Sequence, residues 1–63
     1  MSFEKNLNQL MKERGLSRYR ISKDLGVSPQ TACNWADGKS TPDTKSAMKL
    51  AEYFGVTVEM LMK

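Results

Sequence analysis

Two amide side chains that could read nucleic-acid bases, Gln30 and Asn34, stand four residues apart. Glutamine and asparagine can each make two hydrogen bonds to N6 and N7 of adenine in the major groove. On a helix, where successive residues advance by about 100°, this spacing places both amides on one face. The neighbouring Pro29 and Thr31 carry apolar groups suited to contact with a thymine methyl. Residues 28–37 are therefore either a candidate DNA-reading helix or a helix on which Gln30 and Asn34 are merely polar surface.

The other residues of this segment divide between an inner and an outer face. Four are expected to turn inward: Ser28, Ala32, Trp35 and Ala36. The bulky indole of Trp35 is assigned to core packing rather than to stacking on DNA. Cys33 is expected on the outer flank, where its thiol makes a weak base contact and is open to oxidation. A single cysteine is otherwise a small, inert residue, and both interpretations stay open.

The residue inventory excludes several kinds of catalytic and metal site. The chain has no histidine and one cysteine, so it has no Ser–His or Cys–His nucleophile, too few ligands for a Cys/His metal site and no internal disulfide. It also has no glycine-rich phosphate loop. We therefore expect a protein that is not an enzyme and that uses no cofactor, metal or small-molecule ligand.

Hydropathy gives no sign of a membrane partner. No apolar run approaches the roughly 18–20 residues that a membrane span needs. The first residues, MSFEKNLNQL, lack the apolar core of a signal peptide. Together with the free cysteine, these features predict a cytoplasmic location.

Basic residues gather in one part of the chain. The 63 residues include 10 Lys and Arg against 7 Asp and Glu, a net charge of +3. Residues 12–23 alone hold five bases and one acid. Such a cluster is either a solvated helix face or a surface that meets phosphates, and charge alone leaves both interpretations open.

Glycines and capping residues divide the chain into elements. The pattern Gly-apolar-Ser/Thr occurs three times, at 15–17, 26–28 and 55–57. Each glycine tolerates the left-handed conformation that ends a helix, and each hydroxyl can cap the next helix. Gly38 ends a further segment ahead of Pro42 and Asp43. This punctuation predicts five helices, at about 3–14, 17–25, 28–37, 43–54 and 57–62.

Apolar spacing agrees with these helices and predicts the core. Apolar residues recur three or four positions apart within each segment, and none alternates with period two. The predicted core comprises Phe3, Leu7, Leu10, Met11, Ile21, Leu25, Ala32, Trp35, Ala47, Leu50, Ala51, Phe54, Val58, Leu61 and Met62. We therefore expect one all-α domain over residues 1–63.

The junction of the second and third helices predicts a helix-turn-helix. Only Gly26, Val27 and Ser28 separate Leu25 from Pro29, and helices joined so tightly cross at roughly 90–120°. Val27 would fill the corner of this turn. Ser28 would cap the third helix, with Pro29 in its first turn, where the missing N–H costs nothing.

These motifs resemble a known family. Residues 16–62 are similar to the lambdoid phage repressor and Cro family, the XRE-type helix-turn-helix, through RYRISKDLGVSPQTACNWADG, GKSTP and LAEYFGVTVEMLM. The resemblance implies a five-helix DNA-binding domain with the helix-turn-helix at its second and third helices. It also implies a transcriptional regulator that recognises a double-stranded DNA operator, in a bacterial or phage-infected cell.

The resemblance also assigns roles to individual residues. Its base-reading positions match Pro29, Gln30, Cys33 and Asn34, and Thr31 lies among them. Its phosphate contacts match Arg18, at the start of the second helix, and Lys39, just after the third. Arg20 and Lys45 are further candidates for phosphate contacts, with a solvated surface as the equal alternative.

Some residues depart from the family pattern. Asp37 stands where relatives often have asparagine, and a carboxylate there repels phosphate. Met11 and Ala36 match positions where some repressors pair an arginine with a glutamate, so packing replaces an ion pair here. Tyr19 either contacts the DNA backbone or half-covers the first helix.

Dimer formation is expected from the geometry of operators. One such module reads only a few base pairs, so relatives bind as dimers to half-sites one helical turn apart. Val58, Met60 and Met62 offer a surface for a weak homodimer on DNA. The alternative is that the last helix only seals the core and leaves Met60 exposed.

Two other functional interpretations remain. The same fold serves in protein-interaction modules such as antitoxins or bridging factors. The chain also fits the DNA-binding part of a longer repressor.

Overall fold

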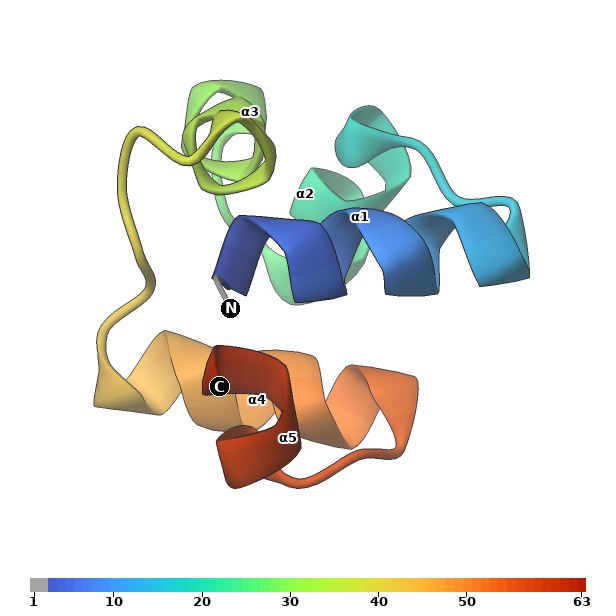
Figure 1. The fold of residues 1–63 in the computed structure, drawn as a ribbon. Helices are drawn as coiled ribbons and strands as arrows, with labels where there is room; N and C mark the ends of the chain where they lie inside the picture. The colour runs from blue at the N-terminus through green and yellow to red at the C-terminus, as the bar shows by residue number, and fades with distance from the viewer. Residues whose placement is uncertain (1–2) are drawn as a thin grey trace.

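The computed structural model describes residues 3–63, which form five α-helices joined by short turns (Figure 1). In chain order they are α1 (Phe3–Arg14), α2 (Arg18–Leu25), α3 (Pro29–Asp37), α4 (Thr44–Phe54) and α5 (Val58–Met62). The described residues contain no strand, so the predicted all-α class is confirmed. Residues 1–2 of the predicted domain lie outside the described residues.

Side-chain caps explain where α2 to α5 begin. Each cap accepts a hydrogen bond at 2.9–3.2 Å from the backbone N–H three residues further on; the caps are Ser17, Ser28, Asp43 and Thr57. Each cap residue has extended backbone angles. The helices therefore start one residue after the predicted positions, because an N-cap stands just outside the helix.

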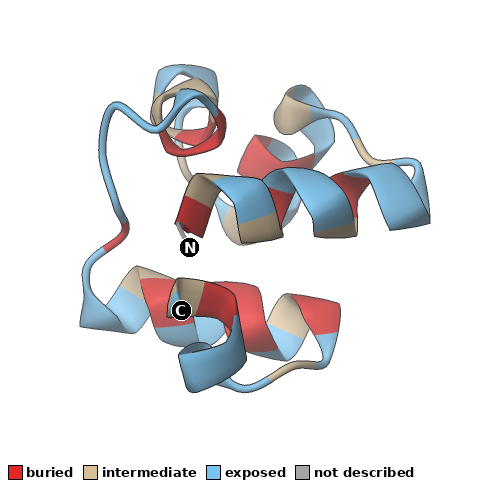
Figure 2. Ribbon diagram, in the orientation of Figure 1, coloured by how far each residue is buried: buried red, intermediate tan, exposed pale blue. Residues whose placement is uncertain are grey.

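The buried side chains of all five helices meet in one core. Figure 2 shows buried segments of α1, α3 and α4 facing the interior. The cluster comprises Phe3, Leu7, Met11, Ile21, Ala32, Trp35, Ala36, Leu50, Ala51, Phe54 and Leu61. Trp35 is only 3% exposed, and its ring meets that of Phe3 edge-on with centroids 6.5 Å apart. The assignment of Trp35 to the core is confirmed, as is the packing of Met11 and Ala36.

Three side chains lie further outward than the sequence predicts. Val58 is 36% exposed because it is the first residue of the five-residue α5 and sits at the edge of its contact. Ser28 is exposed rather than turned inward, since its hydroxyl caps α3. Tyr19 is 64% exposed and does not half-cover α1. It lies about 200° around α2 from the buried Ile21.

Polar side chains of α1 hold the ends of three other helices. The amide nitrogen of Asn6 lies 2.7–3.2 Å from three carbonyl oxygens at the end of α5. The amide of Asn8 donates to the Ala36 carbonyl of α3 at 2.9 Å. Arg14 donates to the Phe54 carbonyl of α4 at 2.7 Å, with its guanidinium 5.5 Å from the Phe54 ring centroid. Since helix ends carry unsatisfied carbonyls, these bonds make α1 the frame on which the others are placed.

Candidate nucleic-acid interface

The turn between α2 and α3 sets the direction of the candidate reading helix. Gly26 ends α2 in the left-handed conformation, with φ of +73°. The N–H groups of Gly26 and Val27 both donate to the Ser22 carbonyl. Ser28 then caps α3, and Pro29 is its first residue. The predicted helix-turn-helix junction is thus present, with Val27 partly buried against the core.

The outer face of α3 brings the two predicted amides together. Gln30 is exposed and Asn34 is half-buried, while the opposite face of the helix is buried through Trp35. The Gln30 Nε2 donates to the Asn34 Oδ1 at 3.0 Å. This bond uses one donor and one acceptor and leaves the Gln30 carbonyl oxygen and the Asn34 N–H groups for a partner. Adenine presents one donor and one acceptor in the major groove, which matches these free groups.

The first two turns of α3 hold the other predicted base-reading residues. Pro29 is exposed, and Thr31 and Cys33 are half-buried. The Thr31 hydroxyl lies 2.8 Å from the Ser28 hydroxyl, so its methyl is the group left for apolar contact. All five candidates therefore belong to one helix, with Gln30 and Pro29 the most exposed of them.

Arg18, predicted to contact phosphate, is paired with a carboxylate of its own chain. Its Nη2 lies 2.8 Å from the Asp37 Oδ1, and the two side chains are 42% and 40% exposed. A hydrogen bond with the Cys33 sulfur, followed by the charge of Asp37, raises the pKa of the Arg18 guanidinium above its usual range. The first residue of α2 is thereby tied to the last residue of α3.

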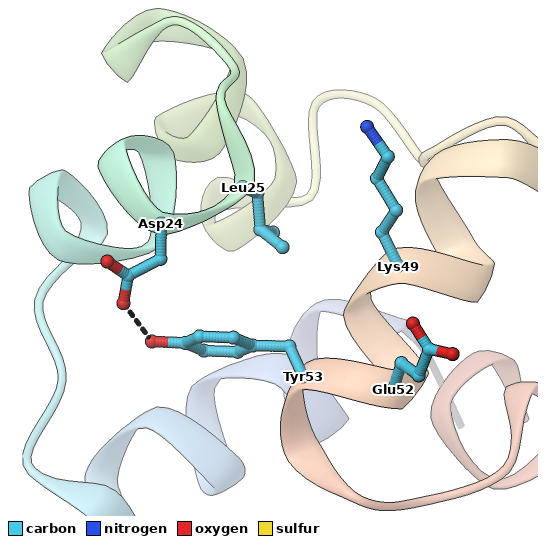
Figure 3. A pocket seen from close by; sticks show the side chains of 5 residues that line it. All are labelled: Asp24, Leu25, Lys49, Glu52 and Tyr53. Atoms are coloured by element: carbon cyan, nitrogen blue, oxygen red, sulfur yellow. Dashed lines mark hydrogen bonds between the residues drawn. The ribbon is translucent and has the colours of Figure 1, made fainter.

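Arg20 takes part in a link between α2 and α4. Its Nε lies 2.9 Å from the Asp24 Oδ2, and the Tyr53 hydroxyl donates to that same oxygen at 2.5 Å (Figure 3). The Tyr53 hydrogen bond, and then Arg20, lower the pKa of the Asp24 carboxyl. The same hydrogen bond raises the pKa of Tyr53. The charge of Arg20 is thus shared with a carboxylate, although its side chain stays 62% exposed.

An open cavity of about 350 Å³ lies beside this link. It is lined by Asp24, Leu25, Lys49, Glu52 and Tyr53 (Figure 3). Its polar groups include both signs of charge, and the hydroxyl of Tyr53 and the carboxylate of Asp24 already satisfy each other. The other two charged groups of the lining, Lys49 and Glu52, carry opposite charges.

Lys39 and Lys45 remain cations on the surface. Both are exposed, and neither makes an ion pair within the described chain. Lys39 directly follows the C-terminal glycine of α3, and its N–H donates to the Asn34 carbonyl at 2.9 Å. Lys45 is the second residue of α4. They flank the loop that leaves the reading helix.

Three arginines of the basic cluster at 12–23 are engaged within the protein. Arg14 caps α4, Arg18 pairs with Asp37, and Arg20 pairs with Asp24. Sequence reasoning treated Asp37 only as a departure from the family and missed its pairing with Arg18. No local pattern in the sequence signals this pairing, because it depends on how α2 and α3 pack against each other.

The predicted dimer surface on α5 is smaller than expected. Met60 is 62% exposed and Val58 36%. Met62 is half-buried and packs against the core, so it is not a second exposed methionine. A cavity of about 170 Å³ between α1 and α5 adjoins Met60; it is lined by Asn6, Gln9, Leu10, Val56, Met60 and Leu61.

The described residues, 3–63, contain no group of three or more His, Cys, Asp or Glu side chains arranged to hold a metal ion. Among the helices of this region, none has the length and apolar character needed to cross a membrane.

Comparison with known proteins points to one family. A helix-turn-helix family model matches residues 7–61. Over 62 residues the chain is 29% identical to the HTH-type transcriptional activator BcrR of Enterococcus faecalis, covering 98% of this chain and 30% of that protein. Over 61 residues it is 31% identical to the SPbeta prophage-derived HTH-type transcriptional regulator YonR of Bacillus subtilis, covering 97% and 56%.

A solved structure agrees with the sequence comparisons. The crystal structure of a transcriptional regulator from Listeria innocua superimposes with a TM-score of 0.91 at 33% identity, covering 97% of this chain and 57% of that one. The chain thus spans about a third to a little over half the length of these proteins.

Proposed function

The chain belongs to the XRE-type helix-turn-helix family, and from this premise we propose that it is a sequence-specific DNA-binding transcriptional regulator that reads a double-stranded operator with α3. The observation that carries the proposal is the hydrogen-bonded pair of Gln30 and Asn34 on the outer face of α3. Buried Trp35 anchors the opposite face of that helix. Regulators among the relatives support the same role.

The amide pair is suited to base recognition because it is held in place before DNA arrives. A side chain already fixed by a hydrogen bond loses less conformational freedom on binding than a free one. Together with Pro29 and Thr31 it forms a short reading surface along the first two turns of α3. We assign adenine and thymine contacts to these residues and a marginal contact to the half-buried Cys33.

Phosphate contacts would position the reading helix without reading sequence. Arg18 at the start of α2, Lys39 after α3 and Lys45 in the first turn of α4 are the cations that we assign to this role. Arg20 is a secondary contact, since it also serves the link to Asp24. Duplex binding would place the protein with the chromosome, and in a bacterial cell the chromosome lies in the cytoplasm.

Selection from a random duplex pool, at moderate salt, tests this proposal. An enriched sequence with adenine-containing positions is expected. On that site Gln30→Ala should lose about 1–3 kcal/mol and relax one base position. Arg18→Ala should weaken all duplexes similarly and reduce the salt dependence.

Gln9→Ala is the matched control for this test. Gln9 is an exposed glutamine on α1 that, like Gln30, donates to a side chain four residues on. On a duplex that carries a single half-site, where the α5 surface beside Gln9 makes no contact, this variant should bind as the wild type does. If Gln30→Ala also behaves like the wild type on the selected site, α3 does not read bases, and the interaction-module interpretation is favoured instead.

We further propose that two copies bind a palindromic operator and touch weakly through α5. Met60 and Val58 form the exposed apolar surface there, beside the cavity shared with α1. Sedimentation on a duplex carrying two half-sites should show two protomers per duplex. Met60→Ser should reduce cooperativity, whereas Met48→Ser, a change at a methionine 59% exposed on α4, should not. A single protomer on the full operator would refute the dimer.

A further inference from the structure

The pair between Arg18 and Asp37 joins the two ends of the helix-turn-helix unit. Arg18 begins α2 and Asp37 ends α3, yet their Nη2 and Oδ1 atoms lie 2.8 Å apart. Both side chains are about two-fifths exposed, at 42% and 40%. The contact is therefore open to solvent and to any partner that approaches this side of α3.

The Arg18 side chain is drawn onto α3 rather than extended into solvent. Cys33 and Asp37 stand four residues apart, so they lie on the same side of α3. The guanidinium pairs with the Asp37 carboxylate, and Cys33 lies one turn earlier on that side of the helix. In the free protein, its position is thus set by α3.

A DNA phosphate would accept hydrogen bonds from the same Arg18 N–H groups that already pair with Asp37. Carboxylate and phosphate oxygens both accept charge-assisted hydrogen bonds from the guanidinium fork, in similar geometry. Exposed ion pairs are weak because water and salt screen them, so a phosphate on a polyanionic duplex can displace the carboxylate. Displacement gives up the ion pair within the protein, so the net gain from the phosphate contact is reduced.

We propose that Asp37 is an internal competitor of DNA phosphate for Arg18 and thereby lowers the affinity for DNA of every sequence. The inference rests on the proposed DNA-binding function, and it adds an affinity-setting residue that touches no base. Binding exchanges one ion pair within the protein for one with DNA. Arg18 therefore contributes less to affinity than an unpaired arginine would.

The competitor makes a measurable prediction for Asp37→Asn, which keeps the size and removes the charge. Affinity should rise about two- to fivefold at moderate salt, the most that loss of an exposed ion pair allows, equally for the selected duplex and for a scrambled duplex of the same length. The slope of log K against log salt should become steeper by up to about one. In the wild type, the Asp37 carboxylate released from Arg18 takes up a cation when DNA binds, and the variant has no such carboxylate. Selectivity between the two duplexes should not change.

A double-mutant cycle tests whether Asp37 acts through Arg18. Wild type, Asp37→Asn, Arg18→Gln and the double variant are titrated against both duplexes over a series of salt concentrations. The gain from Asp37→Asn should vanish in the Arg18→Gln background, so that the double variant binds within twofold of Arg18→Gln. Thermal unfolding of each variant verifies that the fold is intact.

Glu52→Gln provides the control for net charge. Glu52 is an exposed acid on α4, outside the proposed dimer surface, and its removal changes the total charge by the same amount. It should raise the affinity by less than twofold. A rise equal to that of Asp37→Asn would show a general charge effect and overturn the proposal.

Other outcomes would separate failure of this inference from failure of the proposed function. If the wild type selects a site but Asp37→Asn binds no better, the competitor is refuted and sequence-specific binding stands. If the gain persists without Arg18, Asp37 repels DNA directly, and the proposal is equally refuted. If the wild type binds duplexes without selectivity and the cycle still holds, the competitor stands and sequence-specific reading fails. If no variant binds any duplex at low salt, both fail.

Discussion

Replacing Trp35 would test whether the core beneath α3 holds the candidate reading helix in place. The indole is 3% exposed and meets the Phe3 ring of α1 edge-on, with the ring planes at 86°. Trp35→Ala removes the largest side chain of α3 and opens a cavity between α1 and α3. The surrounding helices are joined by short turns, so they cannot move far enough to close it.

The expected loss is large compared with the stability of so small a domain. Truncating a buried aromatic side chain to alanine costs about 3–5 kcal/mol. At about 0.05–0.15 kcal/mol per residue, the 63 residues have a total of roughly 3–9 kcal/mol. Trp35→Ala should therefore unfold much of the population at 25 °C. Trp35→Phe keeps an aromatic ring and should lose only about 1–2 kcal/mol.

Urea unfolding followed by far-UV circular dichroism measures these changes, because the substitution removes the single tryptophan as a fluorescence probe. Tyr19→Ala is the control, since that ring is 64% exposed, and it should change stability by no more than about 0.5 kcal/mol. If Trp35→Ala unfolds with a free energy within about 1 kcal/mol of the wild type, the reasoning from burial is wrong.

Two further predictions concern contacts between helices. Tyr53→Phe removes the hydroxyl that contributes most to the lowered pKa of Asp24. The stability that this carboxylate provides is present above its unfolded pKa of 3.8 and is lost as pH falls through its lower folded pKa. Thermal melts should therefore show a smaller acid destabilisation below about pH 4 in this variant than in wild type, and an unchanged pH profile would contradict the link. Asn6→Ala removes the donor to three carbonyls at the end of α5 and should cost about 1–2 kcal/mol. Amide hydrogen exchange should quicken in α5 and not in α2, and unaltered protection of α5 would show that the bonds are dispensable.

Local sequence signals account for the helices and for the outer face of α3. Caps such as Ser28 and left-handed glycines such as Gly26 act on backbone groups within about four residues. Their effect can therefore be predicted from the sequence alone. The same holds for Gln30 and Asn34, whose shared face follows from helical spacing. The helix-turn-helix junction was predictable because only three residues separate α2 from α3.

Contacts between helices determine two properties that the sequence pattern did not predict: which side chains pair with distant residues, and how exposed some side chains are. Arg18 is paired with Asp37, 19 positions away, and Arg14 with the Phe54 carbonyl, 40 positions away. Nothing in either local segment specifies its partner, because the pairing depends on how the helices cross. The exposure of Tyr19 and Val58 has the same origin, since an amphipathic pattern defines a face but not how far a neighbouring helix extends over it. Residue types thus specified which groups could meet DNA. The packing of α1 to α5 specified which of those groups are already engaged within the protein, because engagement requires atoms from distant segments at hydrogen-bonding distance.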